Sequence, residues 1–93
     1  MIRLHAIVEG HVQGVGFRYW AHHTAQRLEG VGGGFVKNLS NGAVEVEAEA
    51  LDRAPLQALL TELHRGPAQA QVTAVKAKWE ENVEGKHLNF RVA

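Results

Sequence analysis

Apolar and polar residues alternate near both ends of the chain. From residue 2 to residue 8, every second position is apolar: Ile2, Leu4, Ala6 and Val8. Successive side chains of a strand point to opposite faces, so this stretch predicts a strand with one face on a core. Residues 72–81 predict another strand. Residues 87–92 alternate again and predict a short last strand whose Leu88, Phe90 and Val92 share the core side.

The middle of the chain predicts a hairpin over residues 34–50. Its turn is indicated by Asn41-Gly42, because these two residue types tolerate positive φ. The second strand alternates strictly, which places valines and alanines inward. We expect its three glutamates to face solvent: Glu45, Glu47 and Glu49. The glycine-rich segment 30–34 before the hairpin predicts a break between elements.

Two stretches have helical spacing. Apolar or small residues recur at steps of three and four from Phe17 to Leu28, and Gly30 is the expected C-cap. The second helix has Asp52 as the expected N-cap and Pro55 in its first turn, and it ends at Gly66-Pro67. Its core stripe has four leucines: Leu56, Leu59, Leu60 and Leu63. We also assign four aromatic residues to the core: Trp20, Phe35, Trp79 and Phe90.

The elements follow the order β-α-β-β-α-β, with a short extra C-terminal strand. This order predicts an α+β fold, a two-layer sandwich of the ferredoxin-like type. We expect a mostly antiparallel sheet covered on one face by two helices.

Charge and composition narrow the class of protein. Ten Lys and Arg residues balance ten Asp and Glu residues in a chain of 93, and there is no cysteine. Because nucleic-acid and membrane surfaces usually carry a basic excess, we expect neither as a partner. Without disulfides, signal peptide or membrane span, the chain is expected to be a cytoplasmic monomer.

The segment "GHVQGVGFR" at residues 10–18 joins the first strand to the first helix. Glycine permits a tight backbone turn, in which successive N–H groups can converge on an anion. The free N–H groups at the helix start add positive partial charge, and Arg18 offers two parallel donors. The segment therefore indicates an oxyanion cradle, although an ordinary turn beside a surface arginine fits the glycines alone.

Other chemistry has weaker signals. No G-x-x-x-x-G-K-[ST] or G-x-G-x-x-G motif is present, which disfavours those nucleotide sites. His22 and His23 are adjacent and diverge, so a zinc site is not expected; His11 is the histidine inside the loop. Asn38 lies in a predicted strand, where asparagine is unfavourable, and it either binds something specific or faces solvent near the turn.

Two motifs resemble signatures of the acylphosphatase family. "GHVQGVGFR" is similar to G-x-V-Q-G-V-x-F-R, and "GFVKNLSNGAVEV" is similar to G-[FW]-V-x-N-x-x-[DN]-G-x-V-E. The resemblance covers residues 1–93 and implies a single acylphosphatase-like domain. It implies hydrolysis of acyl phosphates to a carboxylate and inorganic phosphate, without metal or other cofactor.

The resemblance also implies roles for individual residues. Arg18 would bind the phosphoryl group, and Asn38 would orient the attacking water. The backbone cradle would come from the residues between strand and helix: Gln13, Gly14, Val15, Gly16 and Phe17.

The chain departs from the family pattern between Leu28 and Phe35, where "LEGVGGGF" is about two residues longer than usual. This insertion lies just before the strand that carries Asn38, and it either loosens or shifts that strand or only lengthens a surface loop. The alternatives are a module that handles carbamoyl phosphate for a partner and a phosphate-binding domain without catalysis. A ferredoxin-like nucleic-acid module is disfavoured by the neutral charge.

Overall fold

The chain forms the predicted strands and helices in the predicted order. A computed structural model describes residues 1–93 and contains five strands and two helices. In chain order they are β1 (Ile2–His11), α1 (Phe17–Arg27), β2 (Val31–Asn38), β3 (Val44–Ala50), α2 (Arg53–Arg65), β4 (Gln71–Glu80) and β5 (Phe90–Val92).

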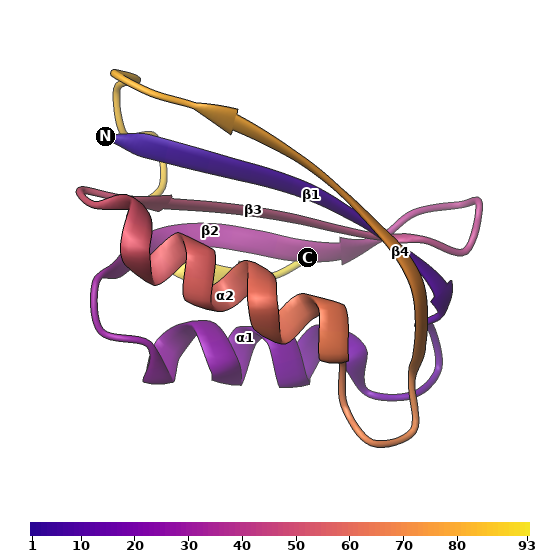
Figure 1. Cartoon of the computed structure of the whole chain (residues 1–93). Helices are drawn as coiled ribbons and strands as arrows, with labels where there is room; N and C mark the ends of the chain where they lie inside the picture. Colours follow the sequence, from indigo (N-terminus) through magenta and orange to yellow (C-terminus); the bar gives the residue numbers. More distant parts are fainter.

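The five strands form one sheet in the order β4-β1-β3-β2-β5. Neighbouring strands are antiparallel except for β2 and β5, which pair in parallel. Both helices lie on the same face of this sheet (Figure 1). The result is the predicted ferredoxin-like sandwich, with a helical layer over a mostly antiparallel sheet.

The core lies between the helices and the sheet. The inward residues of β1 predicted from alternation, Leu4, Ala6 and Val8, are completely buried. All four leucines of the α2 stripe are buried as predicted. Burial of side chains of this size contributes about 1.5–3 kcal/mol each, so this layer supplies the main stabilisation of the fold.

The glycine-rich segment is not the break that the sequence predicts. β2 begins at Val31 and therefore includes Gly32, Gly33 and Gly34. Val31 pairs with Ala50 and Gly33 with Glu49, so one extra residue bulges out of β2 at this point. A Cβ on Gly33 would lie 2.9 Å from His87 Cβ, which explains why the strand needs glycine where another segment crosses it.

Of the two predicted helix caps, the C-cap of α1 is wrong and the N-cap of α2 is confirmed in position only. α1 ends at Arg27 with Leu28 as its C-cap residue, and Gly30, with φ of 101°, lies in the turn beyond. The helix stops early because Leu28 is already extended, with ψ of 114°. Asp52 occupies the N-cap position of α2 as predicted, but its side chain makes no capping hydrogen bond.

The sheet face away from the helices is partly covered, contrary to the prediction for the β3 glutamates. Glu49 is fully buried and Glu47 nearly so, whereas Glu45 remains partly exposed. Residues 81–89, which connect β4 to β5, cover this face, and the backbone N–H groups of Lys86 and His87 donate to Glu49. We call residues 81–89 the covering segment.

Because of the covering segment, two apolar residues that the sequence assigns to the core lie outside it. Leu88 is 99% exposed, because the covering segment is not a strand at that point and β5 begins only at Phe90. Phe35 pairs with Glu47 and so lies on the covered face rather than in the core, with its ring centroid 5.8 Å from that of His87. Phe90 is buried in the core as predicted. Trp20 and Trp79 are partly buried, and both pack against the core.

A buried ion pair joins the covering segment to the sheet. Arg3 Nη2 lies 2.6 Å from Glu49 Oε2 and also donates to the Glu84 carbonyl. Burial alone would raise the pKa of Glu49, but the hydrogen bonds from Arg3 and from the two backbone N–H groups hold it below its usual value. The hydrogen bond to Glu49 raises the pKa of Arg3 in turn.

Glu47 lies in a similar setting. It accepts a hydrogen bond of 2.6 Å from His87 Nε2 and lies 3.4 Å from Lys86 Nζ. Burial would raise the pKa of Glu47, but these partners outweigh burial and lower it. The carboxylates that the alternation places outward therefore hold the covering segment instead of facing water.

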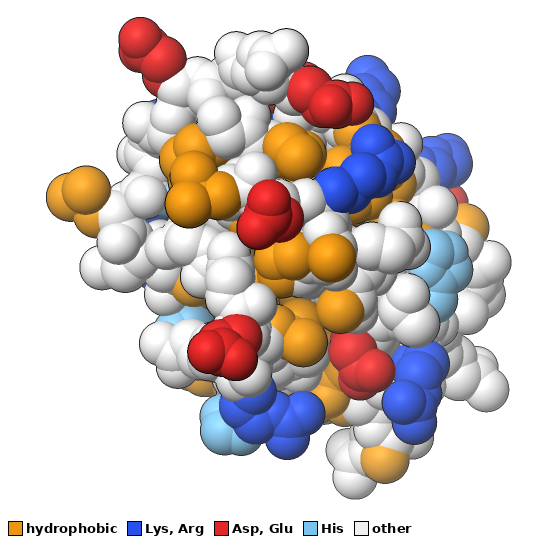
Figure 2. Space-filling model, turned by 60° about the vertical axis from the view of Figure 1, so that its left-hand side comes forward, with side chains coloured by type: hydrophobic (Ala, Val, Ile, Leu, Met, Phe, Trp, Pro, Cys, Tyr) orange, Lys and Arg blue, Asp and Glu red, His pale blue; other side chains and the backbone are white.

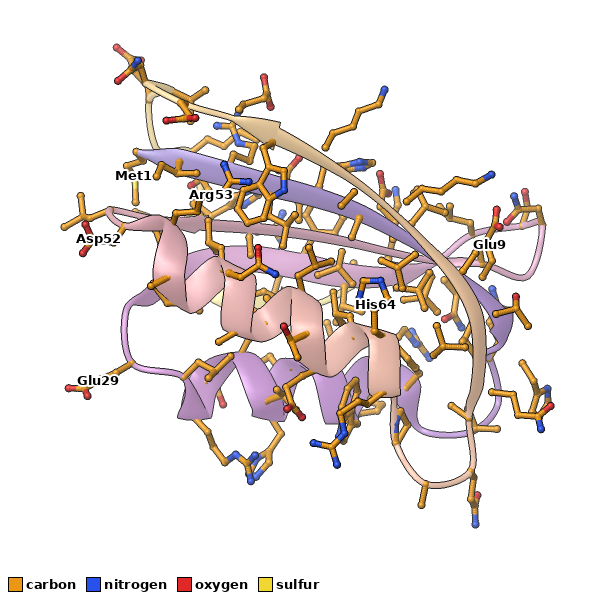
Figure 3. All side chains as sticks on the ribbon, in the orientation of Figure 1. Met1, Glu9, Glu29, Asp52, Arg53 and His64 are labelled. Atoms are coloured by element: carbon orange, nitrogen blue, oxygen red, sulfur yellow. The ribbon has the colours of Figure 1, made fainter.

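The remaining surface carries mixed charge. Figure 2 shows one face on which acidic and basic side chains are interspersed around a band of hydrophobic ones. Arg53 at the start of α2 lies with its guanidinium carbon 3.9 Å from the ring centroid of Trp79 in β4, while Glu29 points outward from the turn after α1 (Figure 3). Neither helix is long and apolar enough to serve as a membrane span.

Candidate functional site

The turn between β1 and α1 is built on two glycines with positive φ. Gly14 has φ of 74° and Gly16 has φ of 77°, a region that other residues adopt only at a cost. A Cβ on either glycine would meet no atom within 4 Å, so glycine is required by backbone conformation and not by crowding. The sequence predicts this tight turn correctly.

The start of α1 presents free backbone N–H groups. Gly16 is the N-cap residue, it has no side chain to cap the helix, and the first turn contains no acidic residue. The N–H of Trp20 bonds to the Gly16 carbonyl, which leaves the preceding helical N–H groups without helical partners. Together with the helix dipole, they make this end of α1 electropositive.

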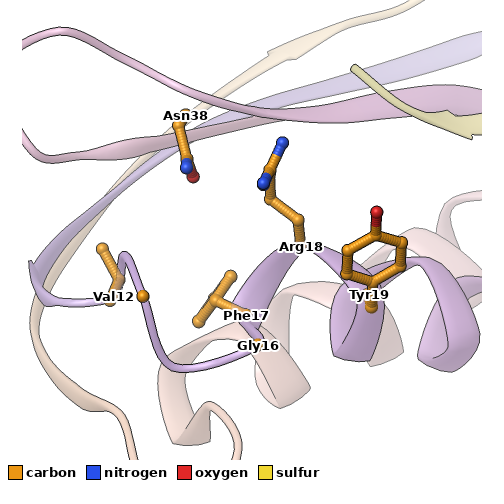
Figure 4. Close-up of a pocket in the computed structure, with 7 residues that line it drawn as sticks. Val12, Gly16, Phe17, Arg18, Tyr19 and Asn38 are labelled. Atoms are coloured by element: carbon orange, nitrogen blue, oxygen red, sulfur yellow. The ribbon is translucent and has the colours of Figure 1, made fainter.

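A hollow of about 160 Å³ lies in front of this helix end. Its lining residues come from the turn, from the first residues of α1 and from the end of β2: Val12, Gly14, Gly16, Phe17, Arg18, Tyr19 and Asn38. Figure 4 shows Arg18 and Asn38 pointing toward each other across it from α1 and β2. The lining contains one cationic side chain and no carboxylate, so the hollow suits an anion.

Arg18 is held from its outer side. Its Nη1 donates a hydrogen bond of 3.0 Å to the backbone carbonyl of Ala93, which follows β5. The side chain is half-buried, and it rises from the first turn of α1 toward β2 (Figure 4). This bond leaves other N–H groups of the guanidinium available to a ligand, since arginine has five donors.

Asn38 is the last residue of β2, and it is exposed. It pairs with Val44 at the base of the hairpin, and the register is regular from Gly33 to Asn38. The bulge at Gly32 takes up an extra residue before this stretch, so the longer glycine segment does not interrupt the pairing that carries Asn38. The two residues that the resemblance assigns to the site, Arg18 and Asn38, thus line one hollow.

Gln13 and Val15, which the sequence assigns to the cradle, do not line the hollow. The Gln13 side chain turns toward the hairpin, where its Nε2 donates to the carbonyls of Leu39 at 2.8 Å and Ala43 at 2.9 Å. Val15 packs against the core. His11 is exposed and lies outside the lining.

Sequence reasoning missed three contributors to the site. Val12 and Tyr19 line the hollow, and the Gln13 side chain ties the turn to the hairpin. Tyr19 directly follows Arg18 near the start of the predicted helix. This neighbouring position is the only feature of the sequence that could have assigned Tyr19 to the site. Nothing in the sequence indicates which carbonyls Gln13 meets. No group of three or more His, Asp or Glu side chains is placed to hold a metal ion.

Comparison with known proteins shows which family the chain is similar to. The acylphosphatase family model matches residues 4–92. An acylphosphatase of Thermus thermophilus is 43% identical over 90 residues, 95% of this chain and 99% of that protein. An acylphosphatase of Deinococcus radiodurans is 48% identical over 80 residues, 86% of this chain and 88% of that protein.

Solved structures show the same similarity. The crystal structure of acylphosphatase from Bacillus subtilis matches with a TM-score of 0.89 and 33% identity, covering 100% of this chain and 99% of that one. HypF of Thermococcus kodakarensis matches with a TM-score of 0.81 and 26% identity, but the match covers only 12% of that longer chain.

Proposed function

The chain belongs to the acylphosphatase family, hydrolases of acyl phosphates, and from this premise we propose how its site performs the reaction. The phosphoryl group of the substrate occupies the hollow before α1. Backbone N–H groups of the turn and helix-start residues that line the hollow, Gly14, Gly16 and Phe17, bind its oxygens together with the guanidinium of Arg18. Water attacks phosphorus in line with the bond to the acyl oxygen, and the products are a carboxylate and inorganic phosphate.

The observation that carries this proposal is the joint lining of one hollow by Arg18, Asn38 and the start of α1. Phosphoryl transfer needs charge stabilisation on the equatorial oxygens more than covalent help from the protein. The positive helix end and the arginine supply that stabilisation, and no lining carboxylate opposes it.

Asn38 positions the water in this proposal. Its amide oxygen can accept a hydrogen bond from the water, and its NH₂ can donate to a phosphoryl oxygen. An amide does not take a proton at neutral pH, so Asn38 orients the water without acting as a base. The proton of the water passes to the substrate's own phosphate. A pH profile of kcat/KM without an enzyme group titrating near pH 7 would agree with this route.

The reaction suits such a site because the acyl oxygen departs as a stable carboxylate. The barrier that remains is lowered mainly by holding the water and phosphorus in line, which the two sides of the hollow can do. The bond from Arg18 to the Ala93 carbonyl supports this role, because it fixes the guanidinium before substrate arrives.

The test is turnover of acetyl phosphate, carbamoyl phosphate and a bis-phosphorylated acyl phosphate by the purified chain, with and without a metal chelator. We expect hydrolysis of acetyl phosphate that the chelator does not change. Turnover of carbamoyl phosphate alone would favour the alternative, a module that handles carbamoyl phosphate for a partner. Phosphate binding without any turnover would show a binding domain and overturn the proposed catalysis.

A further inference from the structure

The hollow is small for an entire substrate. Its volume of about 160 Å³ is below the ~300–1,000 Å³ of pockets that enclose most of a drug-sized ligand. In the proposed binding mode the phosphoryl group takes the polar floor formed by the turn and Arg18. The acyl group of all but the smallest substrates must therefore extend over the rim.

Tyr19 is the exposed apolar side chain on that rim. Four lining residues are exposed: Gly14, Gly16, Tyr19 and Asn38. The glycines have no side chain and Asn38 is polar, so only Tyr19 can offer an apolar surface to the acyl group. The tyrosine is 67% exposed, in contrast to its neighbours in α1.

Core packing does not explain the position of the Tyr19 ring. Phe17 and Trp20, on either side of it in α1, pack edge to face with ring centroids 5.2 Å apart against the core. Tyr19 instead stands beside Arg18 on the side away from the glycine turn (Figure 4). Its ring centroid lies 6.0 Å from the Arg18 guanidinium carbon.

Two other large apolar residues are exposed, Leu51 and Leu88, and neither lines the hollow. Scattered exposed apolar residues are ordinary on a protein surface. Tyr19 differs from them because it combines exposure with a place next to the cationic group of the site.

We propose that Tyr19 is a specificity residue that contacts the acyl group and favours acyl phosphates with an aromatic or bulky apolar acyl part. The inference rests on the proposed function, because it presumes that Arg18 holds the phosphoryl group. An aromatic acyl group that leaves the hollow past Arg18 can pack on the exposed Tyr19 ring by offset or edge-to-face contact. A methyl group is too small to reach much of that ring.

The experiment compares kcat/KM for benzoyl phosphate and acetyl phosphate in the wild type and three variants. Both substrates share the reacting group and differ only in the acyl part. In Tyr19→Ser the preference for benzoyl over acetyl phosphate should fall about five- to tenfold, mainly through KM for benzoyl phosphate. Tyr19→Phe keeps the ring and should keep the preference within about twofold.

Leu88→Ser is the matched control, since it removes an apolar side chain that is 99% exposed and does not line the hollow. It should leave turnover of both substrates unchanged. Circular dichroism of all variants checks that α1 is intact.

Three outcomes would overturn the inference. An unchanged substrate preference in folded Tyr19→Ser, with wild-type hydrolysis of both substrates, removes the role of Tyr19 and leaves the proposed function standing. A loss of preference in Tyr19→Phe equal to that in Tyr19→Ser assigns the effect to the hydroxyl group and not to an apolar contact. Absence of any hydrolysis by the wild type removes the proposed function and the inference together.

Discussion

The side-chain amide of Gln13 donates a hydrogen bond of 2.8 Å to the backbone carbonyl of Leu39, the residue next to Asn38. A second bond of 2.9 Å goes to Ala43 on the other side of the hairpin turn. One side chain thus connects the turn before α1 to both ends of the hairpin turn. The spacing between the two sides of the hollow therefore depends on Gln13, although Gln13 does not line it.

Replacing Gln13 should show whether it positions the two sides of the hollow. Gln13→Ala removes both hydrogen bonds, and we expect kcat/KM for acetyl phosphate to fall about 10- to 100-fold because the water and the phosphoryl group lose their alignment. The free energy of unfolding should fall by about 1–2 kcal/mol. Gln26→Ala, at an exposed position of α1, is the control. An unchanged kcat/KM in Gln13→Ala would contradict the positioning role.

Arg18 should be needed for activity and dispensable for stability. We expect Arg18→Ala to lower kcat/KM by about 10²–10³-fold or more, since it removes the charged donor that faces the phosphoryl oxygens. Arg18→Lys keeps the charge but loses the planar pair of donors, and should recover only part of the activity. Arg27→Ala, at the exposed end of α1, is the control. Wild-type turnover in folded Arg18→Ala would exclude this site.

Asn38 is tested by one substitution that truncates the side chain and one that keeps its size. Asn38→Ala removes the group that orients the water, and we expect kcat to fall about 10²-fold with a smaller change in KM. Asn38→Asp adds a negative charge to the anion site, so KM should rise as well. Asn89→Ala, at an exposed position just before β5, is the control. If Asn38→Asp proved as active as the wild type, orientation by the amide would be the wrong explanation.

The order of elements and the helix-side core followed from local periodicity, which depends only on residues close together in the chain. The exposure of Leu88 could not be predicted that way, because alternation does not show at which residue a strand begins. The burial of Glu47 and Glu49 depends on the covering segment, about 40 residues further along. For the site, motif resemblance located Arg18 and Asn38, but the partners of the Gln13 side chain are set by tertiary contacts.

The glycine segment offers a stability test within one strand. A Cβ on Gly34, where φ is 156°, would overlap the backbone of Glu47 in β3, so Gly34→Ala must push the two strands apart. We expect Gly34→Ala to lower the free energy of unfolding by at least about 2 kcal/mol. At Gly32 the nearest atom to a Cβ lies 3.4 Å away, and Gly32→Ala should change stability by less than about 1 kcal/mol. Urea unfolding of Gly34→Ala and Gly32→Ala compares their free energies of unfolding. Equal stabilities would show that the close approach at Gly34 is unimportant.

The buried carboxylates predict how stability depends on pH. The pKa of Glu49 is lowered in the folded chain because the hydrogen bonds from Arg3 and the covering segment outweigh burial, and the pKa of Glu47 is lowered by its partners His87 and Lys86. Unfolded glutamate has a pKa of about 4.3. The folded state therefore binds fewer protons than the unfolded state, and this stabilisation is fully present above about pH 5. This stabilisation is lost as the pH falls below about 4 and passes the lowered pKa values of Glu47 and Glu49 in the folded chain.

Glu49→Gln tests this account directly. At pH 7 it should lower the free energy of unfolding by about 3 kcal/mol, because Arg3 loses its buried carboxylate partner. Between pH 6 and about pH 3, the variant should lose less stability than the wild type, since one of the two carboxylates with a lowered pKa is gone. Glu29→Gln, which alters an exposed side chain in the turn after α1, should behave like the wild type at every pH. Urea unfolding of the three proteins at pH 6, 5, 4 and 3 measures the difference. If Glu49→Gln and the wild type lost equal stability over this range, the buried ion pair would not be the source of the acid sensitivity.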